Sequence, residues 1–102
     1  MKFERTERFK RDYRRLPAKH KREFKEAVAA FHSGAERAAD GQSSPWDNSL
    51  RVKRVEGAPG VWEMTWSWSG PDGRATWEWI EVGGQPAVRW RRIGTHAVFR
   101  DP

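Results

Sequence analysis

The spacing of apolar residues changes part-way along the chain, and this change limits the folds that are available to it. In the first third of the chain apolar residues recur at helical spacing, as in Phe9, Tyr13 and Leu16. From Leu50 onward they alternate with polar residues, as in half-buried strands. A helical first part followed by a sheet-forming second part predicts an α+β domain.

Two helices are expected in the helical part. Residues 2–5 could form a short opening strand, and Thr6 is the expected N-cap of the first helix. That helix breaks at Leu16-Pro17, and Pro17 suits the first turn of the next helix. The second helix is expected to end at Ser33-Gly34, because glycine is common just past a helix end, and residues 36–40 could hold one extra helical turn. The two helices then form a hairpin.

The second part predicts a meander of about four antiparallel strands, separated by turns at residues 56–60, 70–73 and 83–86. Ile93 is out of phase with Val88 and Trp90, which predicts a β-bulge near Arg91-Arg92. The linker residue Trp46 is an expected anchor into the core. The predicted fold is therefore an N-terminal strand and a helical hairpin packed on one face of a mostly antiparallel four-stranded sheet, in a single domain of residues 1–102.

Strand alternation places apolar residues on one sheet face and polar ones on the other. The polar face is predicted to be open and to carry several cations and two carboxylates. Its expected members are Arg51, Lys53, Glu63, Thr65, Arg74, Thr76, Glu78, Arg89 and Arg91.

Composition indicates the class of partner. The chain has 20 Lys and Arg against 14 Asp and Glu, a net charge of +6 and a pI of about 10.3. A small domain this basic usually has a polyanionic partner, although charge also keeps surfaces soluble and attracts acidic proteins. The absence of cysteine excludes disulfides and Cys-ligated zinc, and no phosphate loop or metal-spaced histidine pair is found. We expect no metal, no cofactor, no membrane contact and a cytoplasmic location.

Several segments resemble the RelE/ParE superfamily of bacterial toxins, in their order along the whole chain. They are the helical hairpin, residues 50–55, Gly60-Val61-Trp62-Glu63 and the ending Trp90-Arg91-Arg92-Ile93-Gly94-Thr95-His96. The resemblance implies the RelE-like fold and an antitoxin protein that binds and silences the chain and could form a hetero-oligomer with it. It implies one of two activities. RelE- and YoeB-like toxins cleave mRNA in the ribosomal A site, in contact with rRNA, whereas ParE toxins inhibit DNA gyrase.

Metal-free RNA cleavage needs a base for the attacking 2′-hydroxyl, cations for the phosphate and an acid for the leaving 5′-oxygen. His96 is the favoured acid/base candidate because it matches the C-terminal histidine of YoeB-like toxins. Arg74 matches their phosphate-stabilising arginine. Glu63 is the favoured carboxylate, and cations around it would hold it ionised.

Each of these candidates has a structural alternative. His96 could hold the C-terminal tail by hydrogen bonds, Arg74 could be a solvated strand-end arginine, and Glu63 could form a cross-strand ion pair. The base of YoeB-like toxins lies ahead of the first sheet strand, where Asp47 is the nearest acid, and Glu78 is a further choice. The helix residues His20 and His32 are expected to be structural.

Two cationic strands are predicted to bind RNA. The first resembles the basic strand of RelE-like toxins, and the second lies near the C-terminus. As a cluster they favour phosphate binding, although for each residue taken alone a solvated charge is the favoured interpretation. Their residues are Arg51, Lys53 and Arg54, and Arg89, Arg91 and Arg92.

The chain departs from RelE-like toxins at their C-terminal tyrosine. Phe99 occupies that aromatic position, and the single tyrosine, Tyr13, has core spacing in the first helix. Acid/base chemistry must therefore depend on His96 and a carboxylate. Three hypotheses remain: an mRNA endonuclease, a gyrase inhibitor without chemistry of its own, and an inactive member that only forms complexes with its antitoxin.

Overall fold

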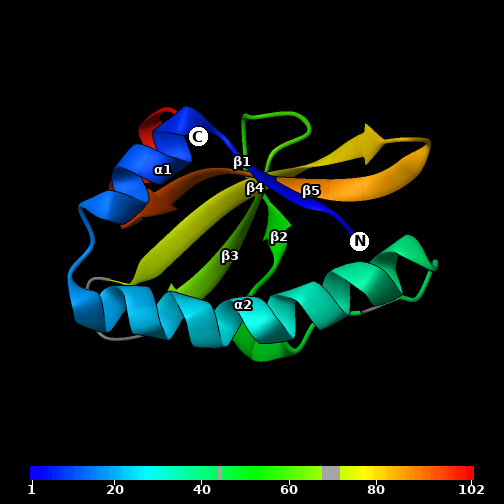
Figure 1. The fold of residues 1–102 in the computed structure, drawn as a ribbon, viewed down its shortest axis with the longest axis horizontal. Helices are drawn as coiled ribbons and strands as arrows, with labels where there is room; N and C mark the ends of the chain where they lie inside the picture. Colours follow the sequence, from blue (N-terminus) through cyan, green and yellow to red (C-terminus); the bar gives the residue numbers. More distant parts are fainter. Residues whose placement is uncertain (44, 68–71) are drawn as a thin grey trace.

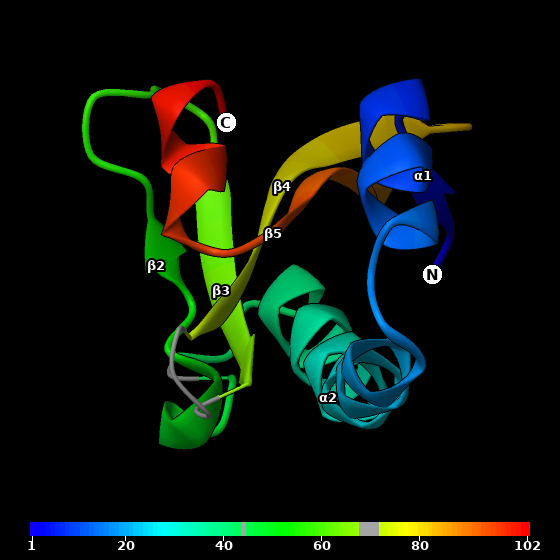
Figure 2. The same cartoon turned by 90° about the vertical axis from the view of Figure 1, so that its left-hand side faces the viewer.

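Two helices and a five-stranded sheet make up the computed structural model, which describes residues 1–43, 45–67 and 72–102. Helix α2 crosses one face of the sheet, and α1 lies beside the end of β5 (Figures 1 and 2). The elements are β1 (Phe3–Arg5), α1 (Glu7–Arg14), α2 (Ala18–Ala39), the 3-10 turn η1 (Asn48–Leu50), β2 (Lys53–Arg54), β3 (Trp62–Ser67), β4 (Gly73–Val82), β5 (Gln85–Gly94) and the 3-10 turn η2 (His96–Arg100).

The sheet has the order β1-β5-β4-β3-β2, and only the β1–β5 pair is parallel. This confirms the predicted α+β class and the opening strand, which adds a fifth, parallel strand to the four antiparallel ones. Thr6 is the N-cap of α1, accepting a hydrogen bond from Phe9 N at 3.0 Å. The Thr6 hydroxyl also donates to the Arg91 main-chain oxygen at 2.7 Å, which connects the start of α1 to strand β5.

Helix α2 does not end at Ser33-Gly34 as predicted, but continues to Ala39. Gly34 is buried inside the helix, and a Cβ atom there would overlap the indole of Trp46. The indole stacks on Phe31 and donates from Nε1 to the Phe31 oxygen at 3.0 Å. Gly34 therefore provides room for a tertiary contact rather than a helix stop, and the prediction of Trp46 as a core anchor is confirmed.

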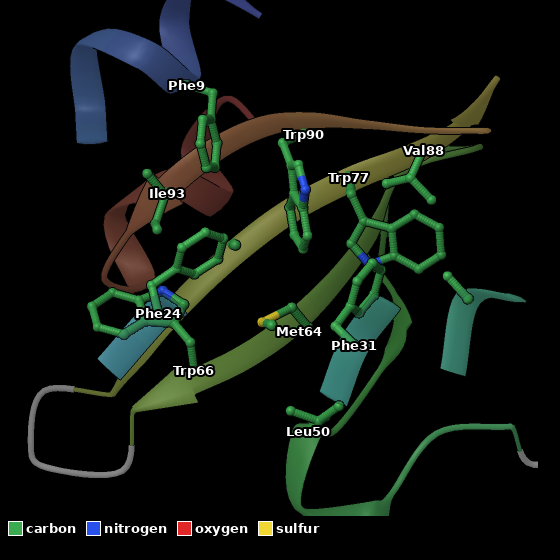
Figure 3. Close-up of a cluster of buried hydrophobic side chains, with 12 residues drawn as sticks. Phe9, Phe24, Phe31, Leu50, Met64, Trp66, Trp77, Val88, Trp90 and Ile93 are labelled. Atoms are coloured by element: carbon green, nitrogen blue, oxygen red, sulfur yellow. The ribbon is translucent and has the colours of Figure 1, made fainter. Parts of the chain in front are cut away.

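The core lies between α2 and the sheet and is largely aromatic (Figure 3). Trp77 and Phe31 are fully buried, and Trp90 packs against Phe24 and Phe31 with ring centroids 5.4 and 4.8 Å away. The expected alternation along β3 and β4 is confirmed, because Met64 and Trp77 face this core. Trp68, the next residue of that apolar alternation in the sequence, and the predicted turn residues Gly70 and Pro71 lie outside the described residues.

The predicted bulge in β5 is confirmed. Consecutive β4 residues Thr76 and Trp77 pair with Arg92 and Trp90, so Arg91 is the extra residue. The bulge allows both Trp90 and Ile93 to reach the core, where they are 3% and 2% exposed.

The predicted strand from Leu50 is mostly wrong. Leu50 belongs to η1, and Arg51 has a left-handed backbone with φ of 44°, so only Lys53–Arg54 pair with β3. Arg51 therefore lies outside the strand in which it was expected. The local alternation of apolar and cationic residues reflects the buried Leu50 side chain rather than a strand.

The polar sheet face is also less open than predicted. The C-terminal turn η2 lies on the side of the sheet away from α2 (Figure 2) and contacts β4 and β5. The face residues Glu63, Thr65, Arg74 and Thr76 are buried, and the Thr76 hydroxyl donates to the Pro102 oxygen. The C-terminal segment converts part of an exposed platform into a covered polar layer.

Candidate active site

A buried ion pair marks the centre of the polar sheet face. Glu63 on β3 and Arg74 on β4 are diagonal neighbours in the register, and their Oε1 and Nε atoms are 3.9 Å apart. The side chains are 11% and 9% exposed. The Arg74 guanidinium also contacts Asp72 Oδ2 at 3.4 Å. The two residues that were predicted to act together are thus brought together by the β3–β4 register.

The Arg74 guanidinium keeps an unused donor. Its Nε atom is buried and has no hydrogen-bond partner among the described residues, and the same holds for the nearby Ser67 hydroxyl on β3. Buried polar atoms are normally paired, so an unpaired donor calls for an explanation. A ligand oxygen delivered to this point would satisfy it.

His96 follows the strand that pairs with Arg74. Gly94 is the β5 partner of Arg74, and His96 begins η2 two residues later. The imidazole is exposed and contacts Phe99 edge-on with centroids 5.2 Å apart. Within the described ranges it makes no hydrogen bond, so it does not hold the tail in the way the structural alternative required. Its surface position leaves it accessible to a ligand.

The expected cations of β5 are paired with carboxylates. Arg91 Nη1 lies 3.1 Å from Glu78 Oε2, and Arg89 contacts both Glu78 at 3.8 Å and Glu4 at 3.3 Å. Glu78 therefore neutralises cations rather than standing next to Arg74 as a base. The β5 cations are held in place but contribute less free positive charge than the sequence indicated.

Arg92 forms a tertiary ion pair with α1. It donates to both carboxylate oxygens of Asp12, at 2.8 and 3.1 Å, and Asp12 also accepts from the backbone nitrogen of Ile93 at 3.2 Å. Hydrogen bonding to Asp12 raises the pKa of the Arg92 guanidinium above its usual range. No local pattern in the sequence indicates this pair, because 80 residues separate its members.

The remaining predicted RNA-binding residues lie near the β2 edge and differ in orientation. Lys53 pairs with Glu63 across the ladder and is exposed on the polar face. Arg54 instead lies over the Trp62 ring, 5.3 Å from its centroid, on the other face. The structure brings Lys53 to the site but not Arg54.

Asp47, the alternative carboxylate, is an N-cap. Its Oδ1 accepts a hydrogen bond from Ser49 N at 2.8 Å. That hydrogen bond to the Ser49 backbone lowers the pKa of the Asp47 carboxyl. A stabilised anion is a weaker proton acceptor, so Glu63 is the better-placed carboxylate.

A second cationic region was missed in reading the sequence. Residues 1–25 contain 11 Lys and Arg against four acids, whereas the other 77 residues contain nine against ten. Net charge counted by segment would have revealed this. Six exposed cations of α1, α2 and the turn between them have no carboxylate partner among the described residues, and we call them the helical basic surface: Arg11, Arg14, Arg15, Lys19, Arg22 and Lys25.

Other site types find no support in the described parts of the chain. Within them, no group of three or more His, Asp and Glu side chains is arranged to hold a metal ion. None of the helices in the described ranges is long and apolar enough to cross a membrane.

Comparison with known proteins supports the fold. No family model matches the sequence, and no curated protein matches it either. Among solved structures, the chain is similar to a YoeB/ParE toxin from Agrobacterium tumefaciens, with a TM-score of 0.60 and 16% identity over 94% of this chain and 99% of that one. The chain therefore has the fold of a RelE/ParE-superfamily toxin.

Proposed function

We propose that the chain is the toxin of a toxin–antitoxin pair and acts as a metal-independent, ribosome-dependent mRNA endonuclease. The observation that carries the proposal is the buried Arg74 guanidinium, which has an unused Nε donor beside Glu63. A guanidinium in such a site stabilises a phosphate that gains charge in the transition state. The fold shared with a YoeB/ParE toxin supports the toxin part of the proposal.

The proposed chemistry is attack of the substrate's 2′-oxygen on the adjacent phosphorus, with expulsion of the 5′-oxygen. A base takes the 2′-hydroxyl proton, and an acid returns a proton to the 5′-oxygen. His96 is the exposed proton donor and acceptor of this site, while Arg74 holds the phosphate. Glu63 orients Arg74 and is the carboxylate next to the phosphate position.

The helical basic surface supports binding to the ribosome. Its six exposed cations lie on the elements that carry the excess positive charge of the chain. Such a surface attracts the phosphates of rRNA without reading their sequence. In this proposal the helices supply attraction to RNA and the sheet face supplies chemistry.

A groove between the helices and β1 supports an antitoxin partner. Aromatic and aliphatic side chains line it, and Arg5 and Lys25 flank it. An antitoxin segment with apolar and acidic residues fits this combination of surface and charge. Its apolar lining consists of Phe3, Phe9, Tyr13, Phe24, Val28 and Trp90.

Induction of the chain followed by primer extension on cellular mRNA tests the endonuclease proposal. We expect cleavage within translated codons, and its loss in Arg74→Ala and His96→Ala. Growth arrest with intact messages would contradict it.

One observation favours a different function, ParE-like inhibition of DNA gyrase. Most cations of the sheet face are already paired with carboxylates, so the free positive charge lies on the helices, as in a binding module without chemistry. Supercoiling by purified gyrase in the presence of the chain decides this. Unchanged supercoiling would remove the alternative.

A further inference from the structure

The last two residues of the chain lie on the polar sheet face and are held there by donors from three elements. Arg91 Nε and Thr76 Oγ1 donate to the Pro102 oxygen at 3.0 and 3.1 Å. Arg92 Nη1 donates to the Asp101 oxygen at 3.3 Å. Arg8 Nη2 donates to Asp101 Oδ2 at 2.8 Å and to its main-chain oxygen at 3.4 Å. We call these four donors the tail site: Arg8, Thr76, Arg91 and Arg92.

The tail site has the composition of a phosphate receptor. Three guanidinium groups and one hydroxyl converge on three oxygen atoms, namely Asp101 Oδ2, the Asp101 main-chain oxygen and the Pro102 oxygen. Arginine forks and hydroxyl groups are the side chains that proteins direct at backbone phosphates. In chemical terms, the oxygens of residues 101–102 stand in for the non-bridging oxygens of a phosphodiester.

The tail site adjoins the candidate active site. Thr76 lies two residues from Arg74 on the same face of β4 and pairs with Glu63 on β3. Residues two apart on a strand are separated by about 6.6 Å. That spacing is comparable to the separation of neighbouring phosphates in an extended nucleic-acid strand, so one strand can address both positions.

We propose that the tail site binds a backbone phosphate of single-stranded nucleic acid, and that residues 101–102 occupy it when that ligand is absent. The inference rests on the proposed function only for the identity of the ligand. The tail is then a competitive plug that the nucleic acid displaces.

The contacts of the tail suit a plug that can be released. The Arg8 and Asp101 side chains are 40% and 75% exposed, and exposed ion pairs are weak. Val98 is 4% exposed and packs next to Gly94, so it keeps η2 attached when the later residues leave. Thr76 is fully buried at present, and release of residues 101–102 exposes its hydroxyl to a ligand.

The test measures binding of a fluorescent 2′-deoxy oligonucleotide, which cannot undergo 2′-hydroxyl attack. The full chain is compared with a variant that ends at Arg100. If the tail occupies the site about nine-tenths of the time, its removal tightens the Kd about tenfold. In an Arg91→Gln background the same truncation should change the Kd little, because a donor shared by tail and ligand is lost.

Two controls separate the plug from simple charge. Glu81→Gln removes one negative charge at the exposed tip of β4, away from the tail, and should leave the Kd within about twofold. Asp101→Asn weakens the tail without truncation and should tighten binding by a smaller factor, provided thermal melting shows an intact fold.

Equal Kd values for the full and truncated chains, or the same gain in the Arg91→Gln background, would overturn the inference. The proposed function can fail separately. If truncation leaves the Kd unchanged while mRNA is still cleaved, the tail-site inference is rejected and the nuclease proposal stands. If truncation tightens the Kd but no mRNA is cleaved, the nuclease proposal is rejected and the tail-site inference stands.

Discussion

The Nε atom of Arg74 lies 3.9 Å from Oε1 of Glu63, and the two side chains are only 9% and 11% exposed. The pair is charged and buried, yet the Arg74 Nε donor makes no hydrogen bond within the described residues. A purely structural ion pair would satisfy its donors, because an unsatisfied buried group costs about 1–3 kcal/mol. The proposed function assigns this remaining donor to a substrate oxygen.

Arg74→Ala should abolish most cleavage. Loss of one preorganised donor to a transition-state anion costs about 10²- to 10³-fold in kcat. The substitution also leaves Glu63 buried without its partner, which should lower the free energy of unfolding by about 1–3 kcal/mol. The double variant Glu63→Gln/Arg74→Met should regain stability in urea denaturation but not cleavage. Recovery of cleavage together with stability would show that the pair is only structural.

His96→Ala should reduce cleavage by about 10²-fold or more without changing stability. The imidazole is exposed, and its ring contact within the described residues is with Phe99, so its removal should change the free energy of unfolding by less than about 0.5 kcal/mol. Single-turnover cleavage on programmed ribosomes and thermal melting measure the two effects. A large fall in Tm with unchanged cleavage would assign His96 a structural role.

Neutralising the helical basic surface should weaken the salt dependence of ribosome binding. Replacing Arg14, Arg15 and Lys19 by Gln should lower the slope of log K against log salt by about 2, since each lost phosphate contact contributes about 0.7–0.9. Lys10→Gln is the matched control, because Glu7 already pairs with Lys10 at 3.2 Å. An unchanged slope in the triple variant would place the RNA contacts elsewhere.

Gly34→Ala should destabilise the fold even though alanine favours helices. The added Cβ would overlap the Trp46 indole, and overpacking costs about 1–3 kcal/mol, partly offset by a gain of about 1 kcal/mol in helix propensity. Urea denaturation should therefore show a net loss of about 1 kcal/mol. Ser33→Ala, at the exposed neighbouring position, should not destabilise. Equal stability of both variants would mean that Trp46 does not need the space.

Stability should fall in mild acid because of His32. The ring is half-buried against Phe3, with centroids 3.7 Å apart, and burial lowers its pKa, while Glu36 raises it and the N-terminal ammonium lowers it further. The folded state thus favours the neutral His32 ring. The stability that His32 contributes is therefore present above the ordinary histidine pKa of about 6.5, and it is lost as the pH falls below that value.

His32→Phe keeps an aromatic ring against Phe3 and removes the titration. Its Tm should consequently fall less than that of the unmodified chain between about pH 7 and pH 5. Parallel Tm curves for the two proteins would show that other groups set the acid sensitivity.

Local sequence patterns determined much of this fold. The Thr6 cap, the alternation that directs Met64 and Trp77 into the core and the bulge at Arg91 are settled by neighbouring residues and by which face they must bury. The same alternation identified Glu63 and Arg74 as members of one face, and their contact followed from the antiparallel register.

Only the tertiary structure decided the rest, because these features depend on partners far along the chain. Gly34 lies inside α2 because the Trp46 indole packs against it where a Cβ atom would otherwise be. Arg92 is held by a hydrogen bond to Asp12 of α1. The placement of residues 101–102 over Thr76 likewise joins segments that no local period relates. Periodicity specifies which way a side chain points, but packing specifies what it meets there.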